Sequence, residues 1–136
     1  MISNASTQFD IERQWSVVKR LSKDGNTMLI PGAGIVEQSF PAGFRNLSFV
    51  LAYTVIEQVL EALIDAGHVP RPKQMHIGQM MAAASTSLSW IDYGKVETGR
   101  IRRNELAHDG RLLSDSECLE YILAIEQELK LWNVIP

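Results

Sequence analysis

Three side chains with the chemistry to handle a phosphodiester lie close together between positions 103 and 108. Arg103 offers a planar, permanently charged fork that suits phosphate oxygens. His108 is of the residue type that titrates near neutral pH, where acid–base catalysis is most effective. Asn104 precedes His108 by four residues, so a helix would place both on one face. The spacing therefore predicts an anion-binding guanidinium, an amide and an imidazole together at one end of a helix.

The end of this helix is marked by Gly110, because glycine is typical of helix C-termini. His108 then falls in the last turn, where the helix dipole stabilises an imidazolium. Arg103 is expected to share a face with three further residues, Val96, Gly99 and Leu106. An arginine on such an apolar face needs an anionic partner or a network of hydrogen bonds.

The run Arg103-Asn104-Glu105-Leu106-Ala107-His108 has the form R-N-x-x-x-H, and it resembles the R-x(4–6)-H signature of HEPN domains. Those domains are small all-α bundles, and many are metal-independent ribonucleases. The resemblance implies that Arg103 and His108 form the catalytic pair, with Asn104 as its polar companion. It implies RNA as substrate, no cofactor, a homodimer with a shared site, and a toxin or phage-defence role in which an antitoxin or regulatory protein is a further partner. Gly110 departs from the subset of toxins that carry tyrosine there.

Metal-free RNA cleavage needs a base, an acid and a cation that stabilises the charged phosphorane. One motif supplies one histidine, so a two-fold partner would supply the second. We expect the two Arg103–His108 pairs to face each other across one groove. Arg100, Arg102 and Arg111 would add attraction for the RNA backbone. Helix packing through Ala82–Ser85, or the long loop described below, would hold the dimer.

Two other classes of function stay open from the residues alone. In the first, a HEPN-like helical dimer has lost catalysis and binds nucleotide, nucleic acid or a partner protein. In the second, the domain is purely structural, and Arg103 and His108 cap helix carbonyls or pair with Glu105 or Asp109.

Other candidate chemistry is weaker. Glu105-x-x-His108 is half of a di-iron motif, and no second copy exists in the sequence. A metal site from His68, His76 and His108 would need support from the fold. Gly32-Ala33-Gly34 lacks the third glycine of a dinucleotide fingerprint. Cys118 falls on an apolar stripe, which predicts a core residue and not a nucleophile.

Length and composition limit the class of protein. The 136 residues, 46% of them hydrophobic, fit a single globular domain over 1–136. Thirteen basic against sixteen acidic residues give a net charge of −3, which excludes a globally basic nucleic-acid coat. One cysteine excludes a disulfide scaffold. No signal peptide and no uninterrupted apolar stretch of about 20 residues is apparent, so we expect a soluble, cytoplasmic protein.

Helical periodicity predicts an all-α bundle of four to five helices. The first is expected from Thr7 to before Gly25, the second from an N-cap at Asn46 to Gly67, and the third from Gln74 with a buried stripe ending at Ile91. Gly94 is expected to break the chain before a fourth helix over Lys95–Ala107. The last starts at the capping box formed by Ser114 and Glu117.

A long loop, Asn26–Arg45, separates the first two helices and shows no helical period. Its β-prone pieces, Thr27–Ile30 and Ile35–Gln38, could pair as a small hairpin. Loops of this length are uncommon in compact domains, so this one is expected to carry function or to pack on a partner.

Overall fold

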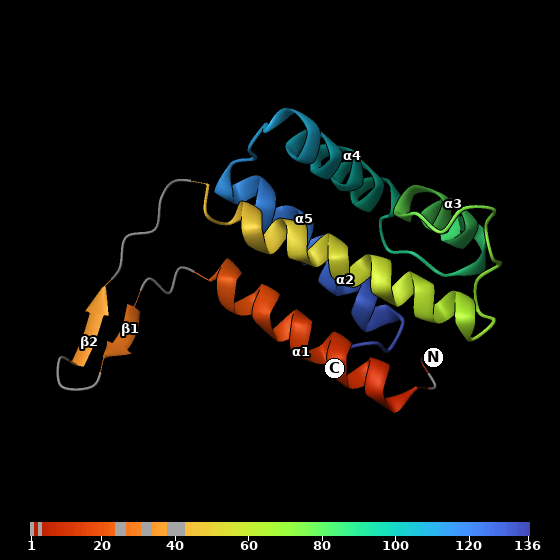
Figure 1. The fold of residues 1–136 in the computed structure, drawn as a ribbon, viewed down its shortest axis with the longest axis horizontal. Helices are drawn as coiled ribbons and strands as arrows, with labels where there is room; N and C mark the ends of the chain where they lie inside the picture. Colours follow the sequence, from red (N-terminus) through yellow and green to blue (C-terminus); the bar gives the residue numbers. More distant parts are fainter. Residues whose placement is uncertain (1, 3, 24–26, 31–33, 38–42) are drawn as a thin grey trace.

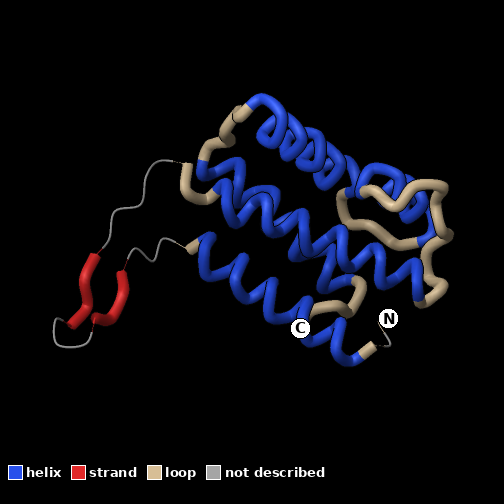
Figure 2. The backbone as a smooth tube through the Cα atoms, in the orientation of Figure 1, coloured by secondary structure: helices blue, strands red, loops and turns tan. Residues whose placement is uncertain are grey.

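A computed structural model describes residue 2 and residues 4–23, 27–30, 34–37 and 43–136; for the two strands it describes the backbone alone. These residues form five helices and two short strands: α1 (Ala5–Ser22), β1 (Thr27–Ile30), β2 (Gly34–Glu37), α2 (Asn46–Asp65), α3 (Ile77–Ser87), α4 (Tyr93–Asp109) and α5 (Asp115–Leu131). The predicted all-α bundle is confirmed (Figure 1). The strands pair as an antiparallel hairpin between α1 and α2 (Figure 2), and β2 begins one residue before the predicted position.

The bundle is built around α2, which packs against all four other helices. In Figure 1, α1 lies below α2, α5 runs behind it, and α3 and α4 lie above. The predicted apolar stripe of α2 is fully buried: Phe49, Tyr53, Ile56, Leu60 and Leu63. Burying aliphatic and aromatic side chains on this scale supplies the main driving force for the fold.

The first two helices begin differently from the prediction. α1 starts at Ala5, because the Asn4 side chain accepts hydrogen bonds from the backbone of Ser6 and Thr7. Asn46 is the first residue of α2 and not its N-cap. Its buried amide instead bonds the carbonyl of Gly43 and both backbone groups of Leu113. Asn46 was predicted to cap its own helix, but its side chain instead connects α2 to the segment between α4 and α5.

The third and fourth helices are also shifted. α3 starts at Ile77 behind a His76 N-cap and ends at Ser87, after which the chain is extended. Ile91 therefore leaves the helical period and is 57% exposed, which corrects the prediction that it is buried. Gly94 does not break the chain, because Asp92 caps α4 and the glycine lies within its first turn. The capping box of Ser114 and Glu117 is confirmed.

α2 has the length and apolar composition of a membrane-spanning helix, and more than half of it is buried within the bundle. The expectation that no stretch is apolar enough to span a membrane was therefore too strict. The central position of α2 in the bundle gives another reason for its hydrophobicity.

The start of α4 is held by a carboxylate that the sequence analysis missed. Glu128 of α5 is fully buried, and its two oxygens accept hydrogen bonds from the backbone of Ile91 (2.7 Å) and Asp92 (2.9 Å). A negative charge just before a helix N-terminus is favourable. The signal was present in the sequence, since Glu128 lies between Ile125 and Leu129 on the buried stripe.

We expect Glu128→Gln to lower the free energy of unfolding by about 2 kcal/mol, because an amide offers one acceptor where the carboxylate offers two. Urea denaturation followed by circular dichroism measures this. Glu120→Gln on the exposed side of α5 is the matched control. Equal stability of the two variants would contradict the role assigned to Glu128.

Candidate functional site

The candidate site lies on α4, which a close contact fixes against α2. The buried Tyr53 hydroxyl donates a hydrogen bond to the carbonyl of Val96 at 2.7 Å. Gly99 makes this approach possible, since a Cβ there would overlap the Tyr53 hydroxyl and lie 2.7 Å from the Tyr121 ring. Burial, followed by the neighbouring Tyr121 and Glu97, raises the pKa of Tyr53 well above its ordinary value. The hydroxyl therefore stays protonated and keeps donating.

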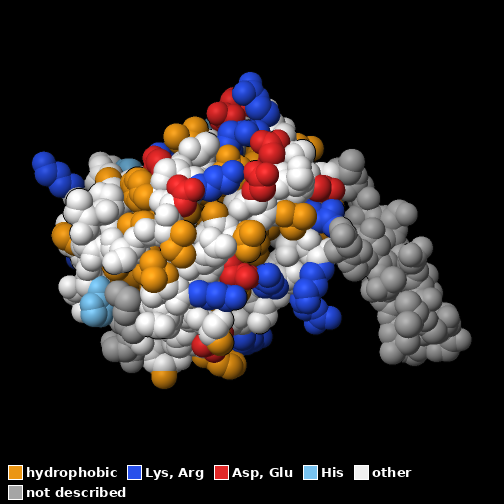
Figure 3. Space-filling view, turned by 180° about the vertical axis from the view of Figure 1, so that it is seen from behind, with side chains coloured by type: hydrophobic (Ala, Val, Ile, Leu, Met, Phe, Trp, Pro, Cys, Tyr) orange, Lys and Arg blue, Asp and Glu red, His pale blue; other side chains and the backbone are white. Residues whose placement is uncertain are grey.

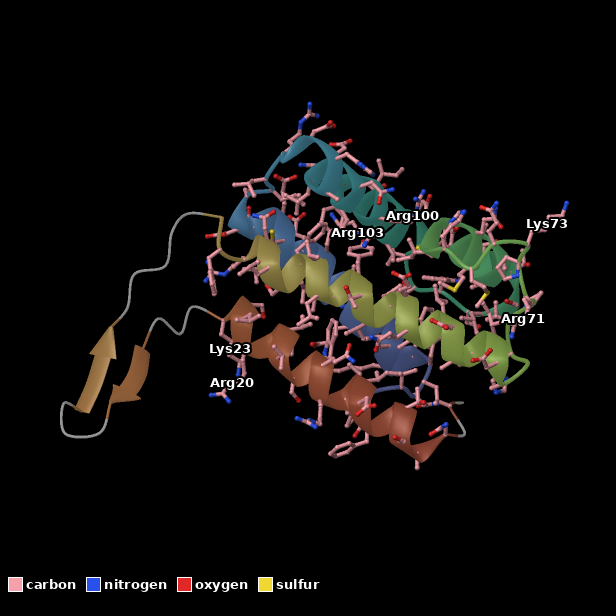
Figure 4. All side chains as sticks on the ribbon, in the orientation of Figure 1. Arg20, Lys23, Arg71, Lys73, Arg100 and Arg103 are labelled. Atoms are coloured by element: carbon pink, nitrogen blue, oxygen red, sulfur yellow. The ribbon has the colours of Figure 1, made fainter. Side chains whose placement is uncertain are left out.

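Arg103 lies on the predicted face of α4, with buried Val96 and Gly99 and partly buried Leu106. The side chain is half-buried, and Figure 4 shows it directed from α4 toward α2. Its Nε is buried without a hydrogen-bond partner. The guanidinium forms no ion pair with any described carboxylate, so the expected anionic partner is not supplied by the described part of the chain.

The neighbouring arginines differ from Arg103, because each is paired. Arg100 forms two hydrogen bonds to Glu97, at 2.9 and 2.6 Å, and these raise its pKa. Arg102 donates to Glu117 at 2.8 Å, which likewise raises its pKa.

Glu105 completes this network. It lies 3.6 Å from Arg102 and 3.5 Å from the exposed Arg111. The positive charges of Arg100, Arg102 and Arg111 are therefore largely neutralised by neighbouring glutamates.

Asn104 is partly buried on α4, and His108 is exposed near its end. Gly110 takes up a left-handed conformation (φ 66°) and ends the helix, so His108 is in the last turn as predicted. Neither side chain hydrogen-bonds to a described residue, and the imidazole is exposed. Five residues at about 100° each place Arg103 and His108 about 140° apart around the helix. One chain therefore presents these two groups in different directions.

The other candidates do not form a site. Among the described residues, no group of three or more His, Cys, Asp or Glu side chains could hold a metal ion. Gly32 and Ala33 of the glycine-rich fragment lie outside the described residues. Cys118 is buried as predicted, and burial, followed by the charges of Asp115 and Glu117, raises the pKa of its thiol to about 11. A thiol in that state is a poor nucleophile.

No protein-family model, curated protein or solved structure matches the chain. The function must therefore be inferred from the side chains themselves.

Proposed function

We propose that this protein is a metal-independent endoribonuclease of HEPN type, acting in the cytoplasm as a toxin or defence effector. One observation carries the proposal: the half-buried Arg103 has no anionic partner among the described residues. A guanidinium in a partly desolvated position binds an anion more strongly than an exposed one. Its planar fork fits two phosphate oxygens.

His108 and Asn104 support the same proposal. The imidazole is exposed at the end of α4 and makes no hydrogen bond within the described chain, so both nitrogens are open to a substrate. Asn104 adds an uncommitted amide one helical turn away. A purely structural motif would instead use these groups to cap carbonyls or to pair with Glu105 or Asp109, and Glu105 is already engaged by Arg102 and Arg111.

In the proposed reaction, one imidazole removes the proton of an RNA 2′-hydroxyl, and the freed oxygen attacks the adjacent phosphorus. The bond from phosphorus to the 5′-oxygen breaks, and a second imidazole, protonated, gives that oxygen its proton. Arg103 stabilises the negative charge on the phosphorane. The products carry a 2′,3′-cyclic phosphate and a 5′-hydroxyl.

The second imidazole comes from a second copy of the chain. A two-fold axis beside α4 would bring His108 of each copy to one groove, since isologous interfaces join the same patch twice. Because Arg103 and His108 lie about 140° apart around one helix, the Arg103 of one copy would act with the His108 of the other. The site is therefore proposed to be complete only in the homodimer.

Chelation gives the first test. Purified protein incubated with mixed RNA should cleave it equally well with and without EDTA, because the proposed acid, base and cation are all side chains. Loss of cleavage in EDTA with recovery in Mg²⁺ would contradict the mechanism. RNA binding without cleavage would favour the alternative, a catalytically inactive helical dimer.

A further inference from the structure

A second basic surface lies away from α4. Lys19, Arg20 and Lys23 stand at the C-terminal end of α1, and Lys130 belongs to the neighbouring α5. We call these four side chains the α1–α5 basic surface. Seen from behind, lysine and arginine side chains gather on the lower part of the molecule (Figure 3), and Arg20 and Lys23 project from the end of α1 (Figure 4).

Two of the four cations are positioned by one carboxylate. Glu126 lies 2.8 Å from the Lys19 ammonium and 3.5 Å from the Lys130 ammonium, and it also accepts from the indole of Trp15. The carboxylate side chain is 12% exposed, whereas the two lysines are 43% and 53% exposed. One negative charge beneath two positive ones leaves an excess of positive charge facing solvent.

The other two cations have no partner among the described residues. Arg20 and Lys23 are exposed and form no ion pair or hydrogen bond to a described residue. Among the described residues that line the groove beside Lys19 and Lys130, the acidic side chains are Glu12 and Glu126. A groove of about 440 Å³ opens beside Lys19 and Lys130, with Trp15 in its wall. Arg20 and Lys23 extend the basic surface beyond this groove, at the C-terminal end of α1.

We propose that the α1–α5 basic surface binds the phosphate backbone of the RNA outside the cleavage site. The inference rests on the proposed function, since that function requires a polyanionic substrate while Arg100, Arg102 and Arg111 are already paired. Complementary charge of this kind supplies most of the sequence-independent affinity for nucleic acid. The surface would hold long RNA on the protein, and Arg103 would act on one phosphodiester.

Binding of a 2′-O-methyl oligouridylate of about 16 nucleotides tests this, because such RNA binds without being cleaved. Each lost phosphate contact costs about fivefold in affinity at 0.1 M salt. Arg20→Gln/Lys23→Gln should therefore raise the Kd about 25-fold and reduce the slope of log K against log salt by about 1.4. The matched control is Arg71→Gln/Lys73→Gln, which removes the same charge from the connection between α2 and α3 (Figure 4).

An equal change in the two double variants, or none in the first, would overturn the proposal. Competition by polyglutamate as strong as that by RNA would also overturn it, since it would indicate an acidic protein as the partner.

Cleavage of a dinucleoside monophosphate, too short to reach α1, separates this inference from the proposed function. It should survive in Arg20→Gln/Lys23→Gln and be lost in His108→Ala. If the wild type cleaves RNA but Arg20→Gln/Lys23→Gln binds the oligouridylate with wild-type affinity, the RNA-binding role of the basic surface is refuted and the proposed ribonuclease function is not.

Discussion

Replacing Gly99 with alanine is expected to destabilise the protein by about 3 kcal/mol or more. The new Cβ would overlap the Tyr53 hydroxyl and crowd the Tyr121 ring at 2.7 Å, and neither aromatic side chain can move, because both are buried. α4 would have to shift away from α2 and lose the hydrogen bond from Tyr53 to the Val96 carbonyl. Thermal and urea unfolding measure the loss.

Gly94→Ala is the matched control, because it lies in the same helix with its nearest neighbour, the Asp92 carboxylate, 3.7 Å from the new Cβ. Alanine there should raise stability slightly through its higher helix propensity. Tyr53→Phe in the Gly99→Ala background should recover part of the loss by removing the overlapping oxygen. A Gly99→Ala protein as stable as Gly94→Ala would contradict the packing described for α4.

Arg103→Ala and His108→Ala are each expected to reduce RNA cleavage at least 100-fold. General acid–base catalysis and one charge-stabilising donor are each worth about that much or more. Neither change should lower the helical circular dichroism signal. The exposed His108 has no partner among the described residues, and the buried Nε of Arg103 has no hydrogen-bond partner, so removing either side chain breaks no described hydrogen bond. Initial cleavage rates on a labelled RNA provide the measurement.

His68→Ala and Lys73→Ala are suitable controls, since each removes an exposed side chain of the same type or charge from the α2–α3 connection. Both should cleave at the wild-type rate. Full activity in His108→Ala would refute the assignment of that residue, and large loss of helix in the same variant would favour a structural role for it.

Periodicity was sufficient to predict the helices and the core-facing position of Arg103, because both depend on local spacing along one helix. The capping box at Ser114 and the end of α4 at Gly110 were predictable for the same reason. Contacts between distant segments of the chain were not predictable from such local patterns. Glu128 holding the start of α4 and the Asn46 amide bonding Leu113 depend on tertiary neighbours that no local pattern specifies.

The pairing of cations could be read from the sequence only in part. Arg100 and Arg102 each have a glutamate three residues away on α4, Glu97 and Glu105, whereas Arg103 has no carboxylate three or four residues away. Glu117 reaches Arg102 only because α5 packs beside α4. Which arginine is available to a phosphate therefore depends both on local spacing along α4 and on the packing of α5.

The central claim is that Arg103 and His108 act in one groove shared by two copies of the chain. Its most direct test is the cleavage rate of wild-type protein mixed and equilibrated with His108→Ala protein at constant total concentration. If each groove needs both histidines, only wild-type homodimers cleave, and an equal mixture retains about a quarter of the wild-type rate. A rate of one half, falling in direct proportion to the wild-type fraction, would show that each chain works alone and would contradict the shared site.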